Sequence, residues 1–121
     1  MTQTFSFDES VFRELGDELG AADTEMVLNT FLEDTATKLL RLEADGQSRS
    51  VIKRDAHSMK SSAATFGFRM LSQLARELEA GVDAMPQAAL QRAIDELRQT
   101  FEATRIFARS NLLNTGPGMA T

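Results

Sequence analysis

The chain has 121 residues, of which 42% are hydrophobic and 26% charged, and its net charge is −5. We expect one globular domain over residues 1–115, with a core of its own, and a frayed tail over residues 116–121. The acidic balance argues against nucleic acid as a partner, because phosphate binding needs a basic field. The absence of cysteine excludes disulfides and thiol catalysis, and one histidine cannot build a histidine-rich metal site, so we expect no bound metal.

No apolar run approaches the roughly 20 residues that a membrane span requires. The first ten residues lack the basic and apolar regions of a signal peptide. We therefore expect a cytoplasmic protein without membrane contact.

Apolar residues recur at steps of three and four, which predicts helices throughout and no strands. A first short helix is predicted over residues 8–19. Ser6 and Glu9 have the spacing of a capping box before it, and Gly20 suits its end.

Three longer helices are predicted next, and each has candidate end signals. Asp23 is the candidate cap of the second helix, which Asp45–Gly46 would end. Ser48 or Ser50 opens the third helix, which stops near Gly67.

The fourth helix ends near Gly81, and Pro86 fits the first turn of a fifth helix. Each helix has a predicted buried stripe. The stripe of the first helix is Val11, Phe12, Leu15 and Leu19, and that of the second is Leu28, Phe31, Leu32, Thr35, Leu39 and Leu42. The stripe of the fourth helix is Met70, Leu71, Leu74, Leu78 and Val82, and that of the fifth is Leu90, Ile94, Leu97, Phe101, Ala108 and Leu112. Four long amphipathic helices joined by short loops bury such stripes most readily side by side. The predicted fold is all-α, an antiparallel up-and-down four-helix bundle with an additional short N-terminal helix.

His57 is the only histidine, and it lies away from the buried stripe of the third helix. That stripe consists of Ile52, Ala56, Met59, Ala63 and Phe66. At roughly 100° per residue, His57 projects roughly 140° from it, so we expect a solvent-facing imidazole. Lys53, Arg54 and Lys60 make a basic spot around His57.

The neighbours of His57 suit phosphoryl transfer. A neutral imidazole keeps a lone pair that can attack phosphorus, and Lys60, one helical turn on, can supply a cation to the phosphoryl oxygens. Lys53, one turn back, is a second candidate, with a simple solvated charge as the alternative. Ser61 and Ala64 are small, so they leave His57 above a low surface on which another protein could dock.

Other chemistry at His57 has less support. A hydrolase triad needs an acid and a hydroxyl in a cleft, whereas this histidine is predicted on a convex helix face. No GxxxxGK loop occurs, so we expect no ATP binding and no autonomous kinase activity. The phosphoryl group would have to come from another protein.

The segment over residues 54–79 resembles the histidine-containing phosphotransfer (HPt) domain family, whose signature reads approximately AHxLKGxxxxxGxxxLxxxxxxLE. The matching residues are Ala56, His57, Met59 in the leucine place, Lys60, Gly67, Leu71, Leu78 and Glu79. Ser61 departs from the pattern, because the family most often has glycine there.

The resemblance implies a bundle that carries a phosphoryl group in a multistep phosphorelay. His57 would accept it from a phosphoaspartate of a response-regulator receiver domain and pass it to another receiver, with a hybrid sensor histidine kinase upstream. Lys60 would contact the phosphoryl oxygens, and Gly67 would be structural, making the tight passage into the next helix. The resemblance places Mg²⁺ on the receiver, so the chain would need no cofactor, and we expect a monomer.

Two questions stay open at this level. Phe68, Leu40 and Met26 point away from their helix stripes, so they either join Ser61 and Ala64 in the docking surface or pack under the first helix or a loop. As alternatives to phosphotransfer, the chain could be an adaptor that binds a receiver or kinase without carrying phosphate, or a self-associating structural protein. An acid-labile, base-stable phosphate on the chain would separate phosphotransfer from both.

Overall fold

The computed structural model describes residues 6–43 and 48–113. These residues form five helices, α1 (Glu9–Leu19), α2 (Ala21–Glu43), α3 (Arg49–Thr65), α4 (Arg69–Gly81) and α5 (Gln87–Asn111). Within the described ranges there is no strand, so the prediction of an all-α fold is confirmed. The predicted helix end at Asp45–Gly46 and the predicted tail over residues 116–121 lie outside the described residues.

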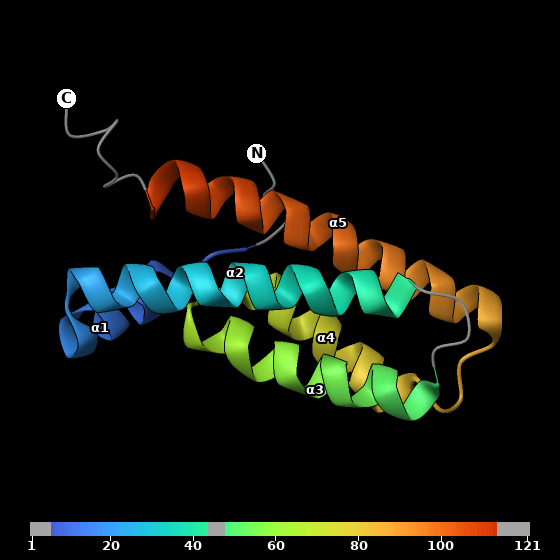
Figure 1. The fold of residues 1–121 in the computed structure, drawn as a ribbon. Coiled ribbons are helices and arrows are strands. Elements are labelled where there is room, and N and C mark those ends of the chain that lie inside the picture. Colours follow the sequence, from blue (N-terminus) through green and yellow to red (C-terminus); the bar gives the residue numbers. More distant parts are fainter. Residues whose placement is uncertain (1–5, 44–47, 114–121) are drawn as a thin grey trace.

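The four long helices enclose the core. α3 packs against α4, α4 against α5, α5 against α2 and α2 against α3, while α1 contacts α2 and α3 at one end of the molecule (Figure 1). The largest fully buried apolar side chains come from all four long helices, the α3–α4 turn and the C-cap of α4: Phe68, Phe101, Leu28, Leu32, Met59, Leu71, Leu78, Leu97 and Val82. The helical periodicity therefore identified the buried faces, whereas the antiparallel order of the helices stays a prediction.

The short helix α1 is less buried than its stripe predicted. None of its residues is fully buried, and Leu19 is exposed, while Phe12 and Leu15 are partly buried against the core. Leu112, at the end of α5, is also only partly buried. Both segments lie at the end of the bundle, where fewer helices surround each side chain.

The capping box predicted for α1 is wrong. Asp8 caps this helix, and its carboxylate accepts hydrogen bonds from two backbone amides of the first turn, at 3.1 and 3.4 Å. The backbone of Ser6 is tied to the start of α4 instead, since its carbonyl accepts a hydrogen bond of 2.8 Å from the Arg69 amide. The cap therefore lies two residues after the predicted one, in a segment whose backbone is held against α4.

The junction between α1 and α2 uses Gly20 for both helices. Its amide donates to the Gly16 carbonyl at 2.8 Å, and its carbonyl accepts from the Thr24 amide at 3.0 Å. α2 therefore begins at Ala21, and the prediction that Asp23 caps it is wrong. Asp23 lies in the first turn instead, where its negative charge is favourable to the helix dipole.

Two further helix starts follow the sequence signals closely. Ser48 caps α3, and its hydroxyl accepts a hydrogen bond of 3.2 Å from the Val51 amide. Pro86 lies one position before α5, which begins at Gln87 rather than at the proline. In both helices the boundary is set by a local residue type that also stands out in the sequence.

Gly67 makes the turn between α3 and α4, as predicted. Its φ is +85°, and its carbonyl accepts a hydrogen bond of 2.7 Å from the Asp8 amide. A Cβ atom at this position would lie 2.5 Å from the Asp8 carbonyl oxygen. Gly67 is therefore needed both for its left-handed backbone and for the close approach of the N-terminal segment.

Phe68 is a core residue, so packing under a neighbouring segment is confirmed for this side chain and its place in the docking surface is wrong. Its side chain is 0% exposed and packs beside the ring of Phe7, with 5.7 Å between the ring centroids. Leu40 and Met26, by contrast, are 71% and 60% exposed, so packing under α1 or a loop is wrong for these two. The N-terminal segment covers Phe68 and leaves the other two uncovered.

Candidate functional site

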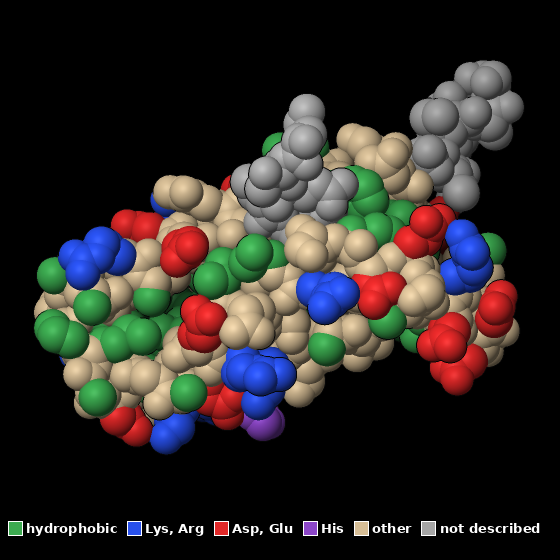
Figure 2. Space-filling view, turned by 180° about the vertical axis from the view of Figure 1, so that it is seen from behind, with side chains coloured by type: hydrophobic (Ala, Val, Ile, Leu, Met, Phe, Trp, Pro, Cys, Tyr) green, Lys and Arg blue, Asp and Glu red, His purple; other side chains and the backbone are tan. Residues whose placement is uncertain are grey.

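His57 lies on the solvent-facing side of α3, as predicted. Its side chain is 62% exposed. Figure 2 shows this one histidine at the edge of the molecule, beside Lys and Arg side chains. Its Nδ1 atom lies 2.7 Å from Oε2 of Glu79, which comes from α4. One ring nitrogen is thus held by the protein, and most of the side chain remains accessible.

Glu79 also binds the cation of the site. Lys60 Nζ lies 2.8 Å from Glu79 Oε1, so one carboxylate joins the imidazole to the ammonium group. The Ser72 hydroxyl donates a hydrogen bond of 2.9 Å to the Lys60 carbonyl, which adds a second tie between α3 and α4 at this level. The structure brings together His57 and Lys60, which were predicted, through a carboxylate to which the sequence assigned no role.

The environment of Glu79 keeps its carboxyl group ionised. The hydrogen bond from Lys60 lowers the pKa of Glu79 below its ordinary value of 4.5, and the hydrogen bond to His57 adds to this, although partial burial acts in the opposite direction. Because folding lowers this pKa, the ionised carboxylate stabilises the fold at pH values above the ordinary pKa of 4.5. This contribution to stability is lost as the pH falls through the lowered pKa of Glu79 in the folded chain.

The ionised carboxylate determines which nitrogen of His57 can react. A carboxylate can only accept a hydrogen bond, so the neutral imidazole must carry its proton on Nδ1 and donate it to Glu79. Nε2 then keeps its lone pair. The site therefore presents an unprotonated Nε2 as a nucleophile, with a lysine ammonium bound to the same carboxylate.

Glu79→Ala should shift the neutral imidazole of His57 from the Nδ1–H form towards the Nε2–H form, because no acceptor would then favour the first. Long-range proton–nitrogen NMR of the chain reports this directly, since His57 supplies the only imidazole signals. Glu79→Gln is the matched control, because its amide oxygen can still accept from Nδ1. An unchanged tautomer in the alanine variant would show that Glu79 does not orient the ring.

The other residues predicted for the site differ in their placement. Ser61 and Ala64 are exposed on α3, as a low docking surface requires. Lys53 Nζ lies 3.1 Å from Asp83 Oδ2, so its ammonium has a partner outside the His57–Glu79 pair. Arg54 lies 3.8 Å from Asp55 and is otherwise largely exposed.

Asp55, two residues before His57, is buried rather than part of the basic surface. It is 2% exposed, and Arg41 of α2 donates to both of its oxygens, at 3.0 and 2.9 Å. A buried carboxylate is stable only when it is paired and hydrogen bonded. The pair therefore ties α3 to α2 two residues before the histidine.

Neither metal ligands nor a membrane span are found in the described part of the chain. Across residues 6–43 and 48–113, no group of three or more His, Cys, Asp or Glu could hold a metal ion. No helix among these residues is long and apolar enough to cross a membrane.

Comparison with known proteins gives one match. The family model of the Hpt domain matches residues 26–105, which include α3, α4 and most of α2 and α5. No curated protein and no solved structure matches the chain. The matched region covers well over half of the sequence and contains His57, Lys60 and Glu79, so the chain belongs to the Hpt domain family.

Proposed function

We propose that the chain relays a phosphoryl group between the aspartates of two receiver domains through Nε2 of His57. Hpt domains act in phosphotransfer within phosphorelays, where they interact with receiver domains and kinases. The observation that carries the proposal is the Glu79 carboxylate, which holds Nδ1 at 2.7 Å and Lys60 at 2.8 Å. This arrangement supports an exposed nucleophilic nitrogen at Nε2 of His57. The bundle that carries it is proposed to have α2 to α5 in antiparallel order.

The proposed step needs no proton transfer. The Nε2 lone pair attacks the phosphorus of the phosphoaspartate, a new N–P bond forms, and the P–O bond breaks to release the aspartate carboxylate. The phosphorylated ring keeps its Nδ1 proton and so becomes positively charged, which the Glu79 carboxylate stabilises. Lys60, one turn from His57, offsets charge on the phosphoryl oxygens as they pass between the proteins.

The partner must bring what the chain lacks. The receiver supplies the phosphoaspartate and the Mg²⁺, and a hybrid sensor histidine kinase stands upstream in the cytoplasm. Ser61 and Ala64 are exposed and small, so a receiver can settle close to His57. We expect the chain to act as a monomer in these encounters.

The proposal is tested by incubating the chain with a phosphorylated receiver and characterising the label that it takes up. We expect phosphate that is lost in acid, survives base, and moves to an unphosphorylated receiver when this is added. Stable binding of the receiver without label on the chain would instead support the adaptor alternative.

Lys60→Ala should slow transfer from the receiver by about tenfold or more, equivalent to about 1.4 kcal/mol or more of barrier. The melting temperature should fall only slightly, because both side chains of the lost ion pair are partly exposed and water can replace part of the contact. Lys53→Ala is the matched control, since it removes the same charge from the same helix but from a pair with Asp83. Equal slowing in both variants would mean that only the general field matters, and a fall in stability without slower transfer would make Lys60 structural.

Ala64→Trp should abolish transfer from a receiver, because a bulky side chain would stand where the partner must approach. The variant should still accept phosphate from phosphoramidate, a small donor that needs no docking. Ala88→Trp, at an exposed position near the start of α5, is the control for adding the same ring elsewhere. Transfer from the receiver at the parent rate in the Ala64 variant would place the interface on another side of His57.

A further inference from the structure

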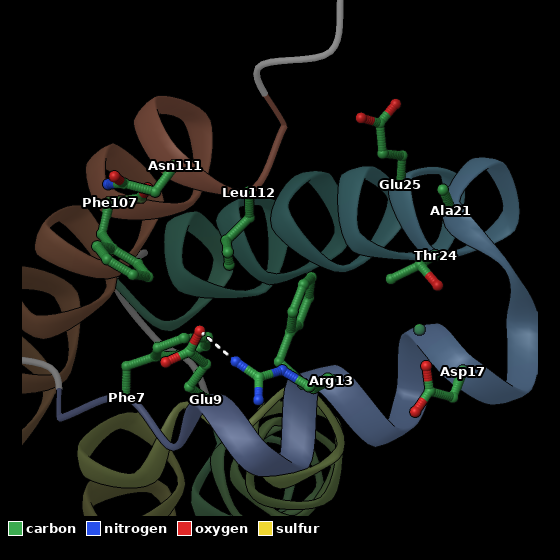
Figure 3. A pocket seen from close by; sticks show the side chains of 12 residues that line it. Phe7, Glu9, Arg13, Asp17, Ala21, Thr24, Glu25, Phe107, Asn111 and Leu112 are labelled. Carbon is green, nitrogen blue, oxygen red and sulfur yellow. Dashed lines mark hydrogen bonds and ion pairs between the residues drawn. The ribbon is translucent and has the colours of Figure 1, made fainter.

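A groove of about 780 Å³ lies between α1, the start of α2 and the end of α5 (Figure 3). Its lining includes a continuous apolar group, Phe7, Phe12, Phe107 and Leu112. The rings of Phe7 and Phe107 lie 4.9 Å apart between centroids, and those of Phe7 and Phe12 lie 5.9 Å apart. No residue of α3 or α4 lines the groove, so it is separate from the site around His57.

The groove lies in the most acidic part of the protein. Residues 8–25 contain seven of the eighteen acids of the chain and one of its thirteen bases, so the rest of the sequence is close to neutral. Figure 2 shows Asp and Glu side chains gathered at the end that Figure 1 gives to α1. The one base, Arg13, pairs with Glu9 at 2.9 Å, which leaves the rim with excess negative charge.

This combination of charge and shape selects the chemistry of an occupant. The negative field repels nucleic acid, anionic lipid and the phosphoaspartate face of a receiver, and it attracts a positively charged partner. The aromatic lining requires large apolar side chains, because polar groups buried there would lose their hydrogen bonds with water. An amphipathic helix that carries apolar residues on one face and Lys or Arg on the other meets both conditions.

We propose that this groove binds a basic amphipathic helix of a partner protein. The apolar face of that helix packs on Phe7, Phe12 and Phe107, and its cations lie against the acids of α1, including Asp17 on the rim. The interaction is independent of phosphotransfer. His57 and the groove would therefore serve two different partners, one that presents an acidic phosphoaspartate and one that presents a basic helix.

The probe for this proposal is a short fluorescent peptide with leucines at helical spacing and lysines at the remaining positions. Its anisotropy with the full chain should show binding at least about tenfold tighter than that of a scrambled peptide of the same composition, which lacks an apolar face. Gly16→Leu should weaken binding of the helical peptide by at least about tenfold. Gly16 lines the groove, and a Cβ there meets nothing nearer than Thr24 Oγ1 at 4.0 Å, so leucine fills the space without changing any charge.

A matched pair of charge variants separates the groove from general attraction. Asp17→Asn alters a lining residue, whereas Glu14→Gln removes the same charge from an exposed position of α1 outside the lining. The first should weaken binding clearly more than the second, and this pair decides the question even if Gly16→Leu failed to fold. Equal weakening in both, or equal binding of the scrambled peptide, would overturn the proposal.

Two further measurements exclude other occupants. Sedimentation of the chain alone should show no dimer formed through the groove. A dimer that dissociates in Gly16→Leu would mean that a second copy of the chain occupies the groove. The methyl NMR signal of Met119 should not change in Gly16→Leu. A change would mean that the chain's own terminal residues occupy the groove. His57→Gln should bind the peptide like the parent chain, and Gly16→Leu should accept phosphate from phosphoramidate like the parent, so a failure of either proposal is visible separately.

Discussion

Replacing His57 with Gln should reduce phosphate uptake from a phosphorylated receiver by about a thousandfold or more, equivalent to about 4 kcal/mol of barrier. Glutamine has no nucleophilic lone pair on nitrogen, and the sequence contains no second histidine that could take over. Stability should change by less than about 0.5 kcal/mol, because the side chain is largely exposed. The measurement is transfer of labelled phosphate, with urea unfolding in parallel.

The variant should still bind the receiver, since its docking surface is intact. Binding without labelling therefore separates the loss of the nucleophile from the loss of the interface. Label retained on the variant would show that another side chain accepts the phosphate, and the assignment of His57 would then be wrong.

Gly67→Ala should lower the free energy of unfolding by about 2–5 kcal/mol, the largest change in stability that we expect from a single methyl group here. Alanine is strained at φ +85°, and its Cβ would meet the Asp8 carbonyl oxygen at 2.5 Å. The clash involves backbone, so rotation of a side chain cannot relieve it, and the hydrogen bond from the Asp8 amide to Gly67 would have to shift.

The matched control is Gly16→Ala, the same chemical change at a helical position with open space. It should raise the free energy of unfolding by up to about 1 kcal/mol, because alanine is the better helix former. Urea unfolding of both variants checks the pair. A Gly67 variant as stable as the parent would mean that the N-terminal segment can leave the α3–α4 turn at little cost.

The sequence predicted the helices well because the signals are local. Apolar residues at steps of three and four identify the buried side of each long helix whatever it packs against. Ser48 and Gly67 mark helix boundaries for the same reason, since a cap or a left-handed turn depends on one residue type and its own backbone. The solvent-facing position of His57 follows from this periodicity alone, and the exposure in the structure confirms it.

The errors occur where one segment meets another. The Ser6–Glu9 capping box is absent: the backbone of Ser6 is bound to the start of α4, and Asp8 caps the helix. Phe68 looked available for docking because it lies off the stripe of its own helix, but Phe7 covers it. In both cases a residue distant in the sequence changed the environment that the local pattern implied.

The sequence by itself determined that the chain is helical, that its histidine faces water, and that a lysine and small residues lie within two turns of it. Spacing along one helix is sufficient for these properties, because its geometry fixes which side chains share a face. Only the tertiary structure decided that Glu79 joins His57 to Lys60, because these atoms come from two helices separated by a turn. The groove beside α1 depends likewise on three helices meeting at one end, and hydrogen bonds and cavities between helices have no period that a single sequence reveals.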